Sequence, residues 1–319
     1  MREFMMALLD CPACRRGLLK LTIEEKNNIE IVTGKINCAC GAIYPIINAV
    51  PRFLDKYRMD KPQGRDVKIS QVQKRFEYQW KRWGRDEVIF GRTREESKKF
   101  FLDYAGSKIN PGYLKGKFTL DGGCGHGRFA EIMAEFGAYS VGLDLGSGVE
   151  IARYRVEKYP NACIVQGDIM DPPFKKGVFD YIWSNGVIHH TPDTRKAFTR
   201  LAEILKKGGY LDIWLYPKKG FLWEISQESI RFITTRMPAG LLEFFCYLAV
   251  PLLSVVPTFS KTSFPKNSWK ECAQVIYDWY SPKYQTHHTN EEVSEWYRQE
   301  GFMDIEVLDL PVAIVAKKG

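Results

Sequence analysis

From Lys117 to the end of the chain, strand-like and helix-like segments alternate, and this alternation restricts the possible fold more than any other feature. The strand-like segments are short and rich in β-branched and aromatic residues, and they cover residues 118–123, 140–146, 162–169, 179–187 and 210–217. Segments with apolar residues at helical spacing lie between them at 128–137, 148–160 and 194–209, the last closed by two glycines. Such alternation predicts an α/β fold, a parallel sheet with helices on both faces.

Two later segments complete the predicted fold. Residues 218–285 interrupt the alternation with mostly helical, aromatic-rich sequence, and a further helix is expected after Thr289, a suitable N-cap. Residues 303–318 predict two strands in an antiparallel hairpin. The longest uncharged stretch, 244–260, contains two prolines and is near the lower limit for a membrane span. We expect a buried helical insertion there, with an apolar lid or a patch that touches lipid as the alternative.

The first 54 residues form a separate small unit. Its short runs rich in Ile and Val predict strands. So small a unit can hardly bury a sufficient core without an additional stabilising link such as a metal site or a disulfide. Four cysteines in two close pairs could provide that link: Cys11, Cys14, Cys38 and Cys40. Four thiolates spaced in this way suit a tetrahedral, structural Zn²⁺, and the alternative is four reduced, buried thiols.

Residues 55–116 predict a basic, helical connection between this unit and the alternating region. The chain carries 46 Lys+Arg and 38 Asp+Glu, a net charge of +8. Residues 51–117 alone hold 18 basic and 9 acidic residues, so the positive excess belongs to this segment. Its cations and aromatic residues could follow a nucleic acid. We favour a cap over a cofactor, because Lys and Arg stems commonly cover apolar surface, with Tyr78, Gly91 and Arg92 as contributors.

The string LDGGCGHGRFA, residues 120–130, follows a predicted strand and opens a predicted helix, which is the context of a nucleotide-binding loop. The dinucleotide pattern G-x-G-x-x-G would require a small residue at position 128, which is Arg. The pattern acid-x-G-x-G-x-G is satisfied by Asp121, Gly123, Gly125 and Gly127. Two more acids, Asp144 and Asp168, end the next two predicted strands.

These residues resemble the class I S-adenosylmethionine-dependent methyltransferase superfamily, in particular its small-molecule, type 11-like branch. The resemblance covers residues 117–216 and the C-terminal hairpin, and it implies a Rossmann-like seven-stranded methyltransferase sheet. It implies that Asp121 lies near the cationic amino group of the cofactor, that Asp144 accepts hydrogen bonds from the ribose, and that Asp168 binds the adenine amine. The other implied cofactor-binding residues are Gly122, Gly123, Gly125, Gly127, Leu145, Ile169 and Asn185.

Residues 171–174, Asp-Pro-Pro-Phe, match a signature of methyltransferases that act on amino groups of nucleic acids and proteins. In those enzymes the signature follows the fourth strand, whereas here it follows the third. We therefore interpret the Pro-Pro pair as structural. The first unit has its own resemblance: the strings around its cysteines are similar to the Trm112-like zinc-ribbon family, although the second pair there is often C-x-x-C rather than C-x-C.

Methyl transfer often requires a base that removes a proton from the acceptor, and histidine is the natural choice. His189 and His190 follow the fourth predicted strand, and His190 is the stronger candidate. His287 and His288 lie in an aromatic segment that resembles a run folding over the active site in related enzymes, so residues 218–288 are expected to form a lid. The tyrosine candidates in that group are Tyr277, Tyr280 and Tyr284.

The sequence thus favours an S-adenosylmethionine-dependent methyltransferase with a small or lipid-like acceptor. Transfer of the methyl group to an oxygen atom of that acceptor is the first choice. An RNA methyltransferase and a non-catalytic scaffold that kept the fold remain the alternatives. The first residues contain no apolar run long enough for a signal peptide, so a cytoplasmic location is expected. Peripheral membrane contact stays possible, and the oligomeric state is not determined.

Overall fold

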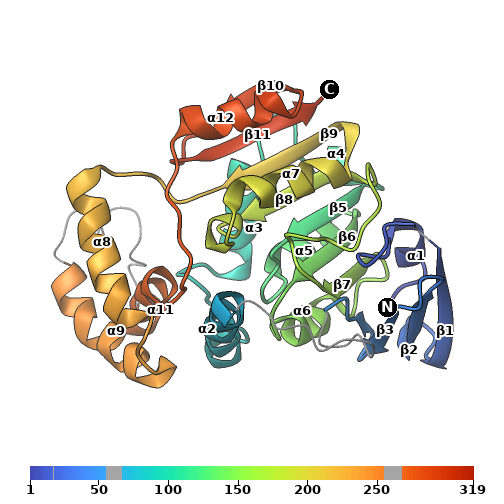
Figure 1. The fold of residues 1–319 in the computed structure, drawn as a ribbon, viewed down its shortest axis with the longest axis horizontal. Helices are drawn as coiled ribbons and strands as arrows, with labels where there is room; N and C mark the ends of the chain where they lie inside the picture. Colours follow the sequence, from blue (N-terminus) through green and yellow to red (C-terminus); the bar gives the residue numbers. More distant parts are fainter. Residues whose placement is uncertain (17, 55–66, 255–267) are drawn as a thin grey trace.

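A computed structural model describes residues 1–16, 18–54, 67–254 and 268–319 (Figure 1). A seven-stranded sheet forms its centre, with the order β10-β11-β9-β8-β5-β6-β7. Its strands are β5 (Phe118–Gly122), β6 (Tyr139–Asp144), β7 (Ala162–Gln166), β8 (Phe179–Asn185), β9 (Leu205–Trp214), β10 (Phe302–Val307) and β11 (Ala313–Lys318). The pairs among β5 to β9 are parallel, and β11 lies antiparallel to both β9 and β10. This is the expected Rossmann-like seven-stranded sheet with its antiparallel hairpin.

Helices cover both faces of this sheet, because alternate residues of each strand point to opposite faces. On β8, Ile182 belongs to the core cluster that contains α7 (Thr194–Ile204) and α12 (Asn290–Gln299). Its neighbours Tyr181 and Trp183 belong to the cluster that contains α3 (Arg94–Tyr104) and α5 (Arg128–Glu135). The remaining short elements near the sheet are α4 (Pro111–Leu114), α6 (Val149–Val156) and the 3₁₀ turn η2 (Ile188–His190).

One boundary differs from the sequence prediction. The glycine pair at 208 and 209 does not close α7, which ends at Ile204 and is followed directly by β9. The register between β8 and β9 shifts between Phe179 and Tyr181, and Gly208 adopts φ +76° there. The glycines therefore serve a strand irregularity, for which a left-handed residue is suited, rather than a helix end. At the start of the helix Asn290–Gln299, the Thr289 side chain accepts a hydrogen bond from Glu292 N, as the sequence predicted for an N-cap.

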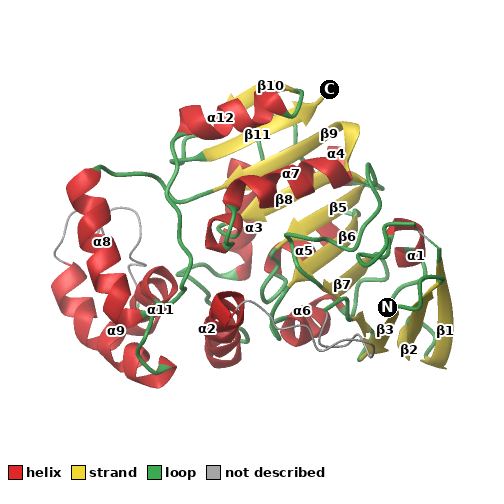
Figure 2. Cartoon of the chain, viewed as in Figure 1, coloured by secondary structure: helices red, strands yellow, loops and turns green. Residues whose placement is uncertain are grey.

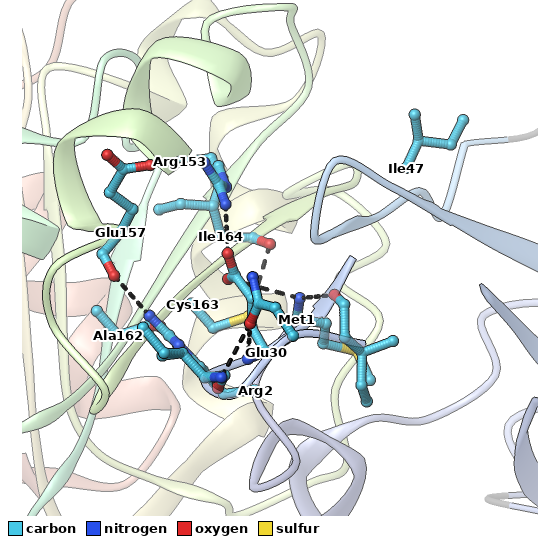
Figure 3. A network of polar contacts seen from close by, with 12 residues as sticks. Met1, Arg2, Glu30, Ile47, Arg153, Glu157, Ala162, Cys163 and Ile164 are labelled. Atoms are coloured by element: carbon cyan, nitrogen blue, oxygen red, sulfur yellow. Dashed lines mark hydrogen bonds and ion pairs between the residues drawn. The ribbon is translucent and has the colours of Figure 1, made fainter. Parts of the chain in front are cut away.

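The first unit contains α1 (Met5–Leu8) and a four-stranded antiparallel sheet, β1 (Leu19–Lys26), β2 (Ile31–Cys38), β3 (Ile43–Ile47) and β4 (Val50–Pro51). Its buried residues share one hydrophobic cluster with the large sheet. Figure 3 shows the polar part of this contact. Arg2 donates to the carbonyl oxygens of Glu157, at 2.7 Å, and Tyr159, at 3.2 Å, and Glu30 pairs with Arg153 of α6. The unit therefore packs firmly against the α6–β7 edge.

Four helices form a second group beside the sheet: α2 (Val67–Trp83), α8 (Phe221–Thr234), α9 (Ala239–Ser254) and α11 (Trp269–Tyr280) (Figure 2). The expectation of a buried insertion at 244–260 is wrong for the part that the structure describes. Only one side of α9 is buried, with Leu242, Cys246 and Val250 in the cluster around α11, while Phe244 and Leu252 are exposed. Residues 255–260, like the basic residues 55–66, lie outside the described residues. Among the described helices, none is both long and apolar enough to cross a membrane.

Candidate active site and candidate metal centre

A cavity of about 710 Å³ opens at the carboxyl ends of β5, β6, β7 and β8. Parallel strands place these ends at one edge of the sheet, where α/β proteins bind ligands. The three acids singled out in the sequence all line the cavity: Asp121 in β5, Asp144 at the end of β6 and Asp168 two residues beyond β7. Leu145, Ile169 and Asn185 line it as well. Tertiary structure thus brings together residues from four separate strand ends.

The glycine loop between β5 and α5 adopts left-handed backbone angles, with φ +84° at Gly123, +53° at Gly125 and +83° at Gly127. A Cβ atom on Gly125 would lie 2.6 Å from the Trp80 ring, and one on Gly127 would lie 2.7 Å from Ala152. Both the angles and the close approaches therefore require glycine. Gly123 itself lines the cavity. Gly122, Gly125 and Gly127 shape the loop without being among the described residues on the cavity wall.

The carboxylates already hold parts of the loop. Asp121 accepts a hydrogen bond from Ala130 N at 3.0 Å, and burial raises its pKa to about 7. Asp144 accepts from Gly125 N at 2.9 Å and from Gly146 N at 2.7 Å, and burial raises its pKa as well. Each carboxylate oxygen can accept a second hydrogen bond. Both acids therefore keep acceptor capacity toward the cavity while they fix the loop.

Two guanidinium groups, Arg92 and Arg128, also line the cavity. Arg128 stands at the position where the dinucleotide pattern would need a small residue, and it is not among the site residues expected from the sequence. Burial and the neighbouring Arg92 lower the pKa of Arg128 to about 9. Among the described residues, no carboxylate forms an ion pair with either arginine. Two partly desolvated cations side by side favour an anion in the cavity.

Helix α2 forms a wall of the cavity through Val72, Gln73, Phe76 and Trp80. The Trp80 ring stacks on His126 of the glycine loop with ring centroids 4.8 Å apart. Gln73 donates to the carbonyl oxygen of Leu145 at 3.2 Å, so the helix is also tied to the β6 end. Arg92, which follows this helix, reaches the cavity, whereas Tyr78 points to α9 and bonds Glu243. The aromatic spacing in 67–83 predicted a helix, but not which of its rings would meet the loop.

His190 is the histidine candidate that the structure brings to the cavity wall. Its Nδ1 lies 2.9 Å from the carbonyl oxygen of Tyr284, which can only accept a hydrogen bond. This contact assigns the proton to Nδ1 and leaves Nε2 as an acceptor. Nε2 is buried and has no hydrogen-bond partner among the described residues. Burial lowers the pKa of His190 to about 3, so its imidazole is neutral near pH 7.

The other base candidates, His189, His287, His288 and Tyr280, are not brought to the cavity wall in the described part of the chain, which corrects their predicted placement. His189 is fully buried against the Tyr216 ring, with centroids 4.1 Å apart. His287 pairs with Glu224, and His288 bonds Glu292 at 3.1 Å and Thr286 at 2.9 Å. His287 thus ties its segment to α8, and His288 ties it to α12. Of the tyrosines in that group, Tyr284 lines the cavity; Tyr277 stacks on Tyr78 instead.

A second group on the cavity wall was not identified from the sequence. Tyr216 donates its hydroxyl hydrogen to Asp278 at 3.0 Å, and its ring stacks on Trp279 with centroids 4.2 Å apart. All three residues line the cavity beside His190. Tyr216 lies two residues beyond β9 and the other two lie in α11, far away in the chain, so only tertiary packing shows this aromatic wall.

The four cysteines of the first unit come together. Their sulfur atoms all lie within 4.8 Å of one another, with Cys14 and Cys38 3.5 Å apart and Cys11 and Cys40 3.8 Å apart. A tetrahedral zinc with Zn–S bonds of about 2.3 Å has sulfur–sulfur edges of about 3.8 Å. The arrangement, C-x-C pair included, therefore fits a four-thiolate metal centre that leaves no open position for chemistry.

Comparison with known proteins bears on residues 120–213, which match the family described as methyltransferase domain. The match runs from β5 to β9, so it covers the glycine loop and all three acids but less than a third of the chain. It begins well after the four cysteines and does not test the resemblance of residues 1–54 to a zinc ribbon.

Individual relatives agree with this match. Phosphoethanolamine N-methyltransferase 2 of Caenorhabditis elegans is 36% identical over 110 residues, which are 33% of this chain and 25% of that protein. A ubiquinone biosynthesis O-methyltransferase of Vibrio vulnificus is 33% identical over 141 residues, 43% of this chain and 59% of that protein. The chain thus spans from a quarter to about three fifths of these relatives. A magnesium protoporphyrin IX methyltransferase from Synechocystis, solved with bound S-adenosylhomocysteine, is 16% identical, with a TM-score of 0.47, over 79% of this chain and 98% of its own.

Proposed function

We propose that this chain is an S-adenosylmethionine-dependent methyltransferase that acts on a small or lipid-like acceptor, with transfer to oxygen favoured. The observation that carries the proposal is the convergence of Asp121, Asp144 and Asp168 on one cavity beside a left-handed glycine loop. The match of residues 120–213 to a methyltransferase domain supports it.

The residues present fit this cofactor, which is cationic at its amino group and anionic at its carboxylate. Asp121 would pair with the amino group. Arg92 and Arg128 would bind the carboxylate, because a nearby anion stabilises buried cations. Asp144 would accept from the ribose hydroxyls. Asp168 and the backbone amide of Ile169 would bind adenine, with Leu145 against the ring and Asn185 on the wall toward the acceptor.

When bound, S-adenosylmethionine supplies a methyl group that its sulfonium has already activated. His190 would orient the acceptor by accepting a hydrogen bond from its hydroxyl at Nε2. Because burial lowers the pKa of His190 to about 3, the imidazole does not retain the proton near pH 7, and the proton would pass to solvent as the new oxygen–carbon bond forms and the carbon–sulfur bond breaks. The hydrogen bond from Nδ1 to Tyr284 orients the ring for this task. The aromatic wall of Tyr216 and Trp279 would exclude water and align the acceptor.

The basic character of the chain gives less support to an RNA substrate. In the described part of the segment, several cations are engaged by neighbouring acids: Arg94 and Lys98 with Glu135, Lys99 with Asp103, and Arg82 with Glu243. Cations held in this way are less available to phosphates. An affinity for RNA that falls steeply with salt would favour the RNA alternative instead.

The direct test is calorimetric titration with S-adenosylhomocysteine. We expect binding by the wild-type protein and at least about a hundred-fold weaker binding by Asp144→Ala, because the ribose loses its acceptor and Gly125 N loses its partner. Asp103→Ala, on the exposed face of α3, is the matched control and should bind normally. Absence of binding by the wild type at millimolar concentration would overturn the proposal.

For the first unit, we propose a structural zinc bound by Cys11, Cys14, Cys38 and Cys40. The support is the tetrahedral spacing of the four sulfur atoms. Because the unit shares its core cluster with the large sheet, the metal would stabilise the whole chain rather than a detached module.

A further inference from the structure

The outer face of α9 is apolar along its described length. Leu241, Phe244, Phe245, Leu248 and Leu252 follow one another at helical spacing, and all five are exposed, Leu252 to 71%. The helix contains one charged residue, Glu243, which is turned inward and bonds Tyr78 and Arg82. The exposed face of α9 therefore carries no charge.

An ordinary surface helix of this chain looks different. Helix α3 buries Ser97 and Phe101 and carries six charged residues among its 11 positions. Surface helices normally place polar residues opposite the buried stripe. Helix α9 does have a buried stripe, which packs on α11, and within the described ranges no element packs on its opposite face to explain that composition.

Helix α8, on the same side of the molecule as α9 in Figure 1, carries a second exposed apolar face. Phe221, Leu222, Ile225, Phe232 and Ile233 are exposed, Leu222 to 81%, and their spacing places them on one side of the helix. We use the term apolar patch for these five residues together with the five of α9. In Figure 1, α8 and α9 form the side of the molecule opposite the first unit.

Cations border this patch at both ends of α8. Lys218 and Lys219 are exposed just before the helix, and exposed Arg236 follows it, with its guanidinium 3.7 Å above the Phe232 ring. Glu228 is the one exposed acid of α8, and helical spacing places it on the side of Ile225 and Phe232, whereas Glu224 is half-buried and pairs with His287. An apolar face with a cationic border complements the anionic surface and apolar interior of a lipid leaflet.

A second copy of the chain is less suited than a lipid leaflet to cover the apolar patch. In a two-fold interface through α8, an antiparallel arrangement would place Lys218 and Lys219 beside the partner's Arg236. A parallel one would place them beside the partner's Lys218 and Lys219. Like charges thus meet in either arrangement, which costs free energy in a desolvated contact.

The patch also begins close to the cavity. Lys219 lines the cavity and is separated from Phe221 by one residue. Trp279, in the aromatic wall, donates its ring N–H to Gln227 of α8 at 3.1 Å. A molecule dissolved in a leaflet under α8 would therefore lie next to the wall that contains Tyr216 and Trp279.

We propose that the apolar patch of α8 and α9 docks the protein on an anionic lipid leaflet, with both helices in the plane of the interface, so that the methyl acceptor reaches the cavity from the lipid phase. The second half of this inference rests on the proposed methyltransferase function. The docking itself does not depend on it.

Flotation with vesicles tests the docking. Vesicles of phosphatidylcholine alone are compared with vesicles of phosphatidylcholine and phosphatidylglycerol in equal parts. We expect the wild-type protein to float with the anionic vesicles and to bind them more weakly as salt is raised. The triple variant Leu222→Ser, Leu248→Ser, Leu252→Ser should lose about ten-fold or more in vesicle affinity, because three exposed leucines no longer enter the leaflet.

The matched control is Leu18→Ser, Ile29→Ser, Tyr154→Ser, which removes three exposed apolar side chains away from the patch. It should bind vesicles as the wild type does. Equal binding by both triple variants, or absence of vesicle binding by the wild type, would overturn the proposal. So would a concentration-dependent dimer that the patch variant abolishes, because the occupant would then be a second copy. Titration with S-adenosylhomocysteine separates the two hypotheses, since the patch variant should still bind it.

Discussion

At the scale of single residues, the cavity combines buried acids and buried bases whose charges depend on what the cavity holds. Asp121 has a pKa raised to about 7 by burial, and Arg128 has a pKa lowered to about 9 by burial and by Arg92. Both shifts disfavour the charged forms of these two groups. A zwitterionic ligand that supplies an ammonium to Asp121 and a carboxylate to the arginines would reverse both. The same residues therefore determine selectivity and pH dependence.

The pH dependence of cofactor binding follows from Asp121. Below pH 7 its carboxyl is protonated and offers no charge to an ammonium, so affinity for S-adenosylhomocysteine should fall as pH is lowered through about 7, approaching ten-fold per unit. Calorimetry measures this affinity between pH 5.5 and 8.5, which is about one and a half pH units on either side of the pKa of Asp121. Asp121→Asn should bind weakly with a flat profile. A wild-type profile as flat as that of the variant would contradict the assignment.

The glycine loop allows a steric prediction. In Gly125→Ala the new Cβ would lie 2.6 Å from the Trp80 ring at φ +53°, so we expect a loss of unfolding free energy of about 2–3 kcal/mol together with weaker cofactor binding. Gly116→Ala is the matched control, because its φ is +74° but no atom lies within 4 Å of the added Cβ. It should cost about 1 kcal/mol. Chemical denaturation compares the two, and an equal cost would mean that the contact with Trp80 is unimportant.

At the scale of elements, α2 lies within the basic segment and contacts the glycine loop. Trp80→Ala would remove the ring that stacks on His126, so we expect about ten-fold weaker binding of S-adenosylhomocysteine. Trp269→Ala, an exposed tryptophan at the start of α11, should leave this affinity unchanged. If both variants bound equally well, α2 would have no role in closing the site.

At the scale of the whole molecule, the first unit and the large sheet form one core, which includes Cys11 and Cys38 of the four-cysteine group. We expect one zinc per chain by elemental analysis, lost in Cys38→Ser and retained in Cys272→Ser, whose thiol lies in α11. Loss of the metal should lower the midpoint of thermal unfolding by about 5 °C or more, in one transition that includes the large sheet. A variant without zinc that unfolds at the wild-type temperature would show that the cysteines do not stabilise the chain.

Much of the fold could be predicted because its signals are local. Alternating periodicity located the strands and most helices, and the spacing of Asp121 and the glycines identified the loop, since turn geometry depends on neighbouring residues. Boundaries were less certain: Gly208 and Gly209 suggested a helix end, whereas the pairing of β8 with β9 places them in a strand irregularity. Register is a property of two strands, and one segment does not contain it.

By itself, the sequence determined the sheet class, the loop and the three strand-end acids, because parallel strands carry their carboxyl ends to one edge. Only the tertiary structure decided which histidine reaches the cavity, that Arg92 and Arg128 stand there together, and that α9 turns an apolar face outward. Each of these depends on the rotation of an element about its own axis. That rotation is decided by packing between segments far apart in the chain, as between α9 and α11.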